Sequence, residues 1–241
     1  MQFALPSAVL SPQQRRSKLR NARIMLIFTP ELCADPLEAL AHAWNEVDVI
    51  QVRPKPLGSG PDAVSSAREC EHWCRQVLSL AERRPEHRPL ILVNDRVDVA
   101  KTLANEGLDG VHLGQEDTPV QVAREVLGSD PLIGLSTHNY REVRAADDLP
   151  VDYLGFGAVF ATSTKEVLAA TRTVPSWVAS SHSRVPVFPI GGITELNAWQ
   201  LAPVGRAAVA SGILAQADPA HAAAAIRRAL TQSGANRRRH F

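Results

Sequence analysis

Eight short runs of apolar, mostly β-branched residues recur along this chain of 241 residues. Each run is hydrophobic throughout instead of alternating with polar residues, which is typical of parallel strands that are buried on both faces. Helix-like stretches separate most of the runs, so the chain consists of repeated strand–helix units. The predicted strands are residues 24–29, 47–52, 90–93, 110–113, 132–136, 152–155, 185–190 and 207–210.

Eight strand–helix units in a chain of this length predict an α/β protein with a single (β/α)8 TIM barrel; the alternative is a doubly wound open sheet, which would leave strands unused. We expect the barrel to span residues 23–231. An extension of residues 1–22 would lie outside the fold, and residues 232–241 would form a basic tail without assigned function. The predicted helices are residues 36–46, 61–83, 96–104, 119–127, 140–147, 195–201 and 219–230, with 165–184 less clearly helical.

Composition narrows the functional classes. With 45% apolar residues, 21% charged residues and a net charge of +1, the chain has no general affinity for nucleic acid or anionic membranes. It has neither a membrane-spanning segment nor a secretory signal, so we expect a cytoplasmic protein. The binding residues described below predict small-molecule partners, and the sequence leaves a homo-oligomer open. The three cysteines fit neither a disulfide framework nor a zinc site and are expected to be buried thiols (Cys33, Cys70 and Cys74).

Two carboxylates follow neighbouring predicted strands. Asp95 comes just after the third strand, and Asp117 comes shortly after the fourth. If these strands are adjacent, both acids open onto the same end of the sheet. Mg²⁺ is commonly held by one or two carboxylates, waters and substrate phosphate oxygens, so the pair suggests metal-assisted diphosphate chemistry. From these acids alone, loop or helix-capping aspartates remain the alternative.

The second predicted strand runs into a basic segment. Gln51, Arg53 and Lys55 are alternate residues, so an extended chain points them to one side. Pro54 and Pro56 favour that extended conformation. One amide and two cations suit a diphosphate attached to a heterocycle, whereas the alternative is a basic loop whose cations meet only water.

A second anion site is predicted where the last two strands end. Strand seven ends at Gly191–Gly192 and strand eight at Ser211–Gly212. Barrels often bind phosphate at this seam through backbone N–H groups, although tight turns also require glycine. Three hydroxyl groups and a lysine at residues 162–165 follow strand six and could also bind phosphate, with Lys165 belonging to the cationic side formed by strands two to four. Ser136, after strand five, could either form a hydrogen bond with the edge of a substrate or cap the following helix.

Five segments together resemble one known family. The segments QVRPK, GVHLGQED, IGLSTHN, DYLGFGAVFATSTK and PIGGIT occur in this order, and the resemblance to thiamine phosphate synthase covers about residues 24–219. It implies a transferase of thiamine biosynthesis. This enzyme would join 4-amino-2-methyl-5-hydroxymethylpyrimidine diphosphate to 4-methyl-5-(2-hydroxyethyl)thiazole phosphate, releasing pyrophosphate with the assistance of Mg²⁺.

The resemblance also implies residue roles. Asp95 and Asp117 would bind Mg²⁺, and Arg53, Lys55 and Lys165 would act on the departing diphosphate. Ser136 would contact the pyrimidine. The other implied substrate-binding residues are Gln51 and Asn94 for the pyrimidine diphosphate, and Thr162, Thr164, Gly192, Ala210 and Ser211 for the thiazole phosphate.

Some residues depart from the family pattern. Pro54 stands where the family usually has an acidic residue, and Ala210 replaces a larger aliphatic. Two alternatives remain: a thiazole tautomerase, and a non-catalytic protein that binds thiamine precursors for regulation. The tautomerase expels no diphosphate and would not need Arg53, Lys55 and Lys165 together with both acids. The regulatory protein would be expected to have a degraded metal site.

Overall fold

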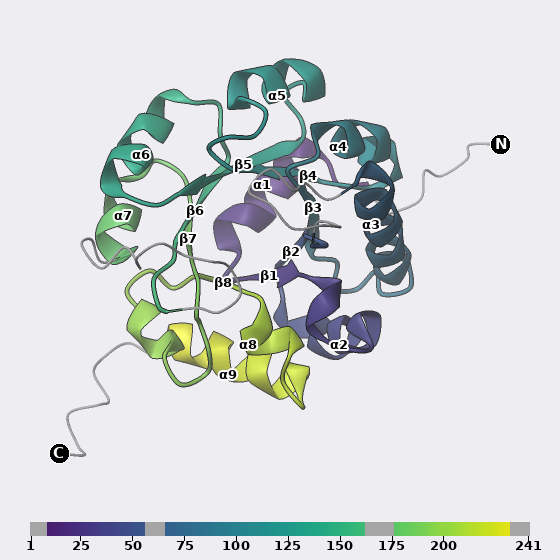
Figure 1. Cartoon of the computed structure of the whole chain (residues 1–241), viewed down its shortest axis with the longest axis vertical. Helices are drawn as coiled ribbons and strands as arrows, with labels where there is room; N and C mark the ends of the chain where they lie inside the picture. Colours follow the sequence, from purple (N-terminus) through teal and green to yellow (C-terminus); the bar gives the residue numbers. More distant parts are fainter. Residues whose placement is uncertain (1–8, 56–65, 162–175, 232–241) are drawn as a thin grey trace.

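A closed barrel of parallel strands forms the centre of the computed structural model, which describes residues 9–55, 66–161 and 176–231 (Figure 1). Each strand pairs with its sequence neighbours, and the last pairs with the first. The predicted (β/α)8 barrel is therefore confirmed, and every predicted run overlaps one strand. The strands are β1 (Ile24–Phe28), β2 (Val49–Val52), β3 (Leu90–Asn94), β4 (Gly110–Leu113), β5 (Leu132–Thr137), β6 (Tyr153–Gly157), β7 (Val187–Ile190) and β8 (Ala207–Val209).

Helices surround the barrel as an outer layer (Figure 1). They are α2 (Pro36–Ala43), α3 (Ala67–Glu82), α4 (Val97–Leu103), α5 (Val120–Leu127), α6 (Tyr140–Ala145), α7 (Ser176–His182), α8 (Ser211–Leu214) and α9 (Pro219–Thr231). Short 3-10 turns extend or replace several of them: η1 (Pro30–Leu32), η2 (Trp44–Glu46), η3 (Ala104–Glu106), η4 (Ala146–Asp148) and η5 (Ala198–Leu201).

The helix predicted for residues 195–201 is wrong, because a 3-10 turn, η5, occupies its second half. The side chain of Asn197 accepts a hydrogen bond from the Thr194 N–H at 2.9 Å and donates to the Gly192 carbonyl at 2.8 Å. Asparagine competes with helical hydrogen bonding in this way. The short helix α8 was not expected either.

Two apolar layers hold the barrel together. Alternate strand residues point into the barrel, and the others pack against the helices. Both faces are therefore buried, which explains the continuous hydrophobicity of the runs. The interior layer consists of Leu19, Ala22, Met25, Ile27, Val49, Leu90, Leu92, Leu132, Tyr153, Phe188 and Ala208.

The outer layer buries two of the three cysteines. Cys70 and Cys74 on α3 are fully buried, whereas Cys33 is partly exposed. Burial raises the pKa of the Cys70 thiol to about 11 and also raises that of Cys74. Since the thiolate is the reactive form, these two thiols are inert packing groups.

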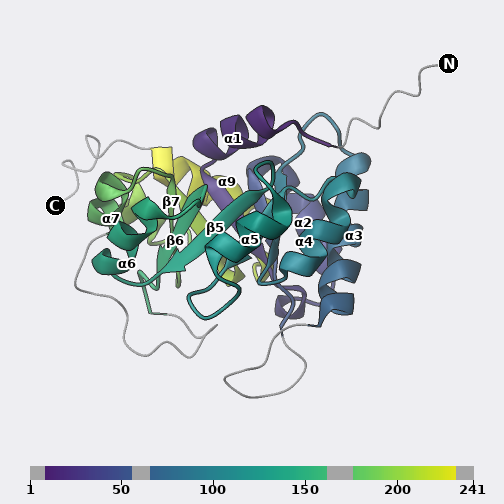
Figure 2. The same cartoon turned by 90° about the horizontal axis from the view of Figure 1, so that it is seen from above.

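An additional helix, α1 (Pro12–Asn21), lies across one end of the barrel (Figure 2). Its Leu19 is only 2% exposed and belongs to the interior layer. Arg15 is also buried and forms an ion pair with Asp109 at 2.9 Å. The expectation that residues 1–22 lie outside the fold is thus corrected for this helix, because α1 closes the amino end of the barrel.

Three aspartates clip neighbouring strands together at that end. Asp48, Asp109 and Asp152 precede β2, β4 and β6, and each donates its N–H to the carbonyl of an isoleucine on the preceding strand. Each carboxylate also accepts the N–H of the same isoleucine, at 2.9 Å in all three cases. These reciprocal bonds fix the register of three strand pairs.

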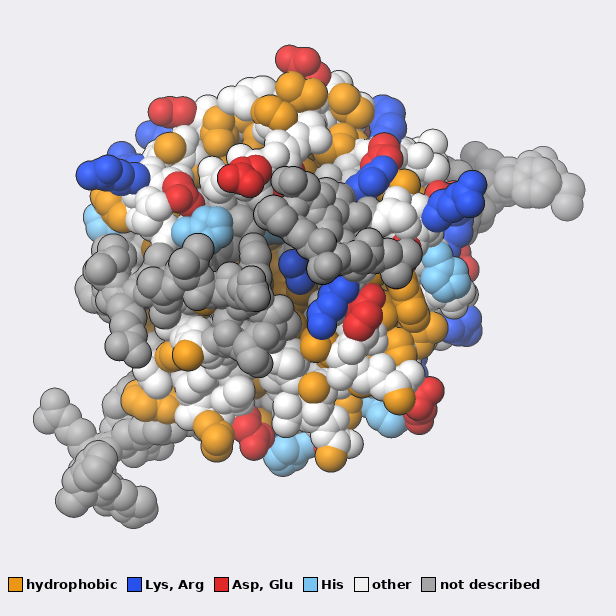
Figure 3. Space-filling model, in the orientation of Figure 1, with side chains coloured by type: hydrophobic (Ala, Val, Ile, Leu, Met, Phe, Trp, Pro, Cys, Tyr) orange, Lys and Arg blue, Asp and Glu red, His pale blue; other side chains and the backbone are white. Residues whose placement is uncertain are grey.

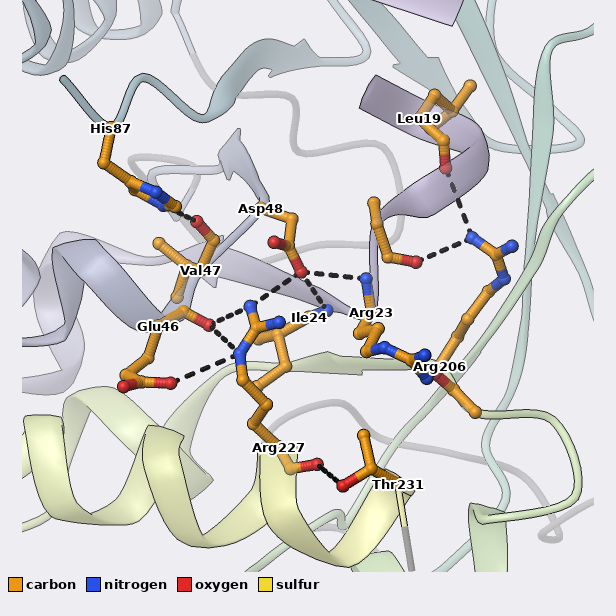
Figure 4. A network of polar contacts seen from close by, with 12 residues as sticks. Leu19, Arg23, Ile24, Glu46, Val47, Asp48, His87, Arg206, Arg227 and Thr231 are labelled. Atoms are coloured by element: carbon orange, nitrogen blue, oxygen red, sulfur yellow. Dashed lines mark hydrogen bonds and ion pairs between the residues drawn. The ribbon is translucent and has the colours of Figure 1, made fainter. Parts of the chain in front are cut away.

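Arginines complete the clips. Figure 4 shows Asp48, which accepts from the main-chain N–H of Arg23 and Ile24 and pairs with Arg227 of α9 at 2.8 Å. In the same view Arg206 donates to the carbonyl oxygen of Leu19 at 3.2 Å. The first strand and the last helix are therefore tied together, and α1 is tied to the loop before β8.

No helix in the described ranges is long and apolar enough to cross a bilayer.

We expect Asp109→Asn to destabilise the fold strongly. Asp109 is completely buried, and its carboxylate pairs with Arg15 at 2.9 Å and with Arg88 at 2.8 Å. Removing its charge leaves two buried guanidinium groups without a counter-ion, which costs about 3–5 kcal/mol. Urea denaturation measures the free energy of unfolding. The exposed Asp130→Asn is the control, expected to change it by less than about 0.5 kcal/mol; equal effects of the two variants would contradict the assignment.

Candidate active site

A cavity of about 350 Å³ opens at the carboxyl ends of the strands. This is the end opposite α1, and Figure 3 shows that face, where basic and acidic side chains lie beside one another near the middle. The location follows the general rule for this fold, in which the loops after the strands build the site. Among the residues expected to bind substrate, those that line the cavity are Gln51, Arg53, Asn94, Ser136, Gly192, Ala210 and Ser211.

The polar side of the cavity begins at the end of β2. Gln51 and Arg53 both line the cavity, as alternation along the extended chain predicts. Gln51 Nε2 donates to Asn94 Oδ1 at 2.5 Å, so the two amides from β2 and β3 form one wall. Lys55 is exposed and is not among the lining residues; its main-chain N–H donates to Glu31 at 3.0 Å.

Asp95 stands at a strained point directly after β3. Its φ of 62° makes it the one non-glycine residue with positive φ in the described ranges. Its N–H donates to the His112 carbonyl at 2.8 Å, and the Arg96 N–H reaches back to the Asn94 carbonyl at 2.8 Å. These bonds enforce a tight turn. Such a conformation costs of order 1–3 kcal/mol, and strain of this kind concentrates at functional sites.

Asp117 lies in the loop four residues after β4, which pairs with β3, so both acids follow adjacent strands at the carboxyl end of the barrel, although neither lines the cavity. The Asp117 carboxylate accepts the Gly114 N–H at 2.6 Å, which orients it. No group of three or more His, Cys, Asp or Glu residues that could hold a metal occurs in the described ranges. Two carboxylates without nitrogen or sulfur ligands fit Mg²⁺, which completes its shell with water and substrate oxygens, better than zinc.

A buried series of hydrogen bonds reaches the cavity wall at the end of β5. Tyr153 Oη lies 2.9 Å from His112 Nδ1, and His112 Nε2 lies 2.9 Å from Ser136 Oγ. Tyr153 is completely buried, and this burial raises its pKa well above the usual range. Ser136, the last residue in this series of hydrogen bonds, lines the cavity. The polar contacts of Ser136 therefore depend on two residues behind it.

The seam between β7 and β8 is built from backbone. Gly192 has φ 61°, and a Cβ there would lie 2.2 Å from the Ala161 carbonyl oxygen. Ala210 precedes α8, and its carbonyl accepts the first helical N–H groups, those of Ile213 and Leu214. The amides of Ser211 and Gly212 thus come before the first intrahelical donor. Backbone donors beside glycines suit a phosphate group.

Three expected site residues, Thr162, Thr164 and Lys165, lie outside the described ranges. Besides Tyr153 and His112, the structure adds two further residues that were not expected from the sequence. Thr29 at the end of β1 is fully buried and lines the cavity, and its hydroxyl has no hydrogen-bond partner in the described ranges. Asn197 braces the loop after β7 from behind. Thr29 could have been found from the sequence, because it is the last residue of the first apolar run. The role of Asn197 could be recognised only from the folded structure.

Comparison with known families identifies one match. The model of the family described as thiamine monophosphate synthase matches residues 24–213. The thiamine-phosphate synthase of Synechococcus sp. (strain CC9605) is 37% identical over 223 residues, which cover 91% of this chain and 59% of that protein. The chain therefore spans less than two thirds of the length of this relative.

Shorter relatives are matched along almost their whole length. The thiamine-phosphate synthase of Chlorobium phaeovibrioides is 35% identical over 87% of this chain and 95% of that protein. The structure of thiamine phosphate pyrophosphorylase from Pyrococcus furiosus superimposes with a TM-score of 0.70 at 28% identity, covering 89% of this chain and 96% of that one. These names support neither the tautomerase nor the regulatory alternative.

We expect Gly192→Ala to weaken phosphate binding at the seam. The new Cβ would collide with the Ala161 carbonyl and displace the loop. Titration with inorganic phosphate, followed by 31P NMR, measures the loss, which we expect to be at least about tenfold in affinity. Gly128→Ala is the matched control, because Gly128 also has positive φ (81°) but nothing lies within 4 Å of its added Cβ. Equal phosphate affinity in the two variants would remove the seam from the site.

Proposed function

The chain belongs to the thiamine monophosphate synthase family, and from this premise we propose that it joins a pyrimidine diphosphate to a thiazole phosphate. The substrates would be 4-amino-2-methyl-5-hydroxymethylpyrimidine diphosphate and 4-methyl-5-(2-hydroxyethyl)thiazole phosphate. The products would be thiamine phosphate and pyrophosphate. Membership of the family supports the reaction class, and the cavity supports the assignment of substrates to its sides.

One observation carries the proposal: a single cavity has two chemically different sides. Gln51, Arg53 and Asn94 present amides and a guanidinium, whereas Gly192 and Ser211 belong to the backbone seam. The first side suits a diphosphate joined to a heterocycle with donors and acceptors. The second suits a phosphate held by main-chain N–H groups. Two phosphorylated substrates would therefore meet inside one enclosure, which favours their reaction by proximity.

The chemistry requires little from the protein beyond charge and position. The amino group of the pyrimidine pushes electrons towards its methylene carbon, so that the bond from this carbon to the diphosphate oxygen breaks. Arg53 lies in the wall and would stabilise the departing diphosphate, together with Lys55 and Lys165. The thiazole nitrogen then attacks the carbon with its lone pair. Because this nitrogen carries no proton, no general base is needed.

We further propose that Asp95 and Asp117 hold Mg²⁺. Their position in the loops that follow two adjacent strands supports this assignment, as does the strained backbone at Asp95. Bound Mg²⁺ would supply positive charge for the departing diphosphate. The carboxylates would hold the ion and leave its remaining positions to water and diphosphate oxygens.

We expect purified protein to form thiamine phosphate and pyrophosphate in equal amounts when both substrates and Mg²⁺ are present. Arg53→Ala should lower kcat/KM for the diphosphate about 100-fold or more, because a donor aimed at developing charge is removed. Thiamine phosphate is measured by fluorescence after oxidation, and pyrophosphate by a coupled assay. The exposed Arg83, which bonds Ser79 on α3, provides the control Arg83→Ala. Binding of both substrates without turnover would sink the proposed reaction.

Asp95→Asn should weaken metal binding at least about tenfold, since changes even to outer-shell partners of metal ligands cost about 10–100-fold. Asparagine tolerates positive φ, so we expect the fold to remain intact. Mn²⁺ titration followed by electron paramagnetic resonance measures binding directly, and the Mg²⁺ dependence of turnover follows it. Asp98→Asn, an exposed acid paired with Arg96, is the control. Unchanged Mn²⁺ affinity in Asp95→Asn would exclude this residue as a ligand.

A further inference from the structure

Three interior positions on β4, β5 and β6 lie side by side. The strand register pairs His112 with Gly134 and Gly134 with Tyr153. Gly134 has no side chain, and a Cβ there would lie 2.1 Å from Tyr153 Cζ. The space above this glycine is therefore filled by the tyrosine, which reaches across it to His112. The two ring centroids are 5.4 Å apart, with planes inclined by 31°.

The hydroxyl of Tyr153 is a buried hydrogen-bond donor. Tyr153 is completely buried, and its ring packs edge-on against Phe188, with centroids 5.8 Å apart. Within the described ranges, the hydrogen bond of this hydroxyl runs to His112 Nδ1, at 2.9 Å. Because burial raises the pKa of Tyr153, the hydroxyl keeps its proton at neutral pH. Burying an O–H group without an acceptor costs free energy, so the proton points at Nδ1, the acceptor within reach.

This donation fixes the tautomer of His112. When Nδ1 accepts, the proton of a neutral imidazole must reside on Nε2. His112 Nε2 lies 2.9 Å from Ser136 Oγ and therefore donates to it. The serine oxygen is then already an acceptor, and its own proton is left for a partner in the cavity that Ser136 lines. The serine backbone is also held, because Gln115 Nε2 donates to its carbonyl at 2.5 Å.

We propose that Tyr153 is a positioning residue that acts through His112 and makes Ser136 a hydrogen-bond donor to the bound heterocycle. The wall would then select a ring with an unprotonated nitrogen or another acceptor at this point. The reverse order would turn Ser136 into an acceptor and leave the Tyr153 proton without a partner. The identity of the heterocycle rests on the proposed function, whereas the direction of the hydrogen bonds does not.

The tautomer is tested first in the ligand-free protein. Protein labelled with 15N in its histidine rings shows which nitrogens carry protons, and His112→Gln identifies the signals of His112 among those of the eight histidines. We expect a protonated Nε2 and an unprotonated Nδ1 at neutral pH. Tyr153→Phe keeps the ring but removes the donor, so it should convert His112 to a mixture of tautomers. A protonated Nδ1 in the unmodified protein would overturn the inference, whether or not the variant folds.

Kinetics test the consequence. Tyr153→Phe and Ser136→Ala should each lower kcat/KM for the pyrimidine diphosphate roughly tenfold, the value of one directed hydrogen bond. The double variant should be no worse than Ser136→Ala, because both changes remove the same interaction. A merely structural role of Tyr153 would instead make the losses multiply, which would overturn the proposal. The matched control is Tyr140→Phe, at the other tyrosine of the chain, which lies outside the cavity lining and contacts His182.

The outcomes separate this inference from the proposed function. If the unmodified protein shows the expected tautomer but forms no thiamine phosphate, the proposed function fails and the hydrogen-bond direction remains. If it forms thiamine phosphate but shows the other tautomer, the function holds and the role of Tyr153 is refuted. A substrate analogue with carbon in place of the accepting ring nitrogen adds a direct check. The unmodified protein should prefer the natural substrate to this analogue in kcat/KM, and the Ser136→Ala variant should lose that preference.

Discussion

Reciprocal hydrogen bonds at the amino ends of the strands set the geometry on which the rest of the barrel depends. Asp48, Asp109 and Asp152 each exchange two bonds with the isoleucine opposite, and each also pairs with arginine. A one-residue slip of one strand would turn the interior side chains of that strand outwards. By pinning three strand pairs, these carboxylates decide which side chains enter the barrel. They therefore also decide which side chains reach its carboxyl end, where the cavity lies.

The same interactions explain what the sequence could and could not reveal about the fold. The eight strands were predictable because burial on both faces leaves continuous apolar runs. Helix α1 was not, because its arginines resemble a solvated basic cluster. Arg15 and Arg16 find their partners, Asp109 and Asp152, only after the chain has folded. A charged residue can be assigned to the core only when its distant counter-ion is known, and a single sequence does not provide that pairing.

The site shows a similar division. That Gln51 and Arg53 line the cavity was predictable from alternation along an extended chain, because this rule is local, whereas Asn94 was expected from the family resemblance. The chain from Tyr153 through His112 to Ser136 depends on the register of three strands and on the space above Gly134. From the sequence, Ser136 was therefore expected either at a substrate edge or at a helix cap, and its supporting residues were not expected. Local chemistry marks the side chains that touch a ligand, whereas those that orient them emerge only from the pairing of strands.

The two ends of the barrel differ in their interactions: those at the amino end stabilise the fold, whereas the carboxyl end contains strained backbone. At the amino end, buried ion pairs and strand clips stabilise the fold around Asp109. At the carboxyl end, Asp95 adopts a strained turn, and Gly192 has a left-handed backbone that other residues rarely adopt. Strain of this kind persists only where the surrounding structure over-determines it. The rigid amino end therefore permits the carboxyl end to keep Asp95 and Gly192 in the backbone conformations that the proposed metal and phosphate sites would use.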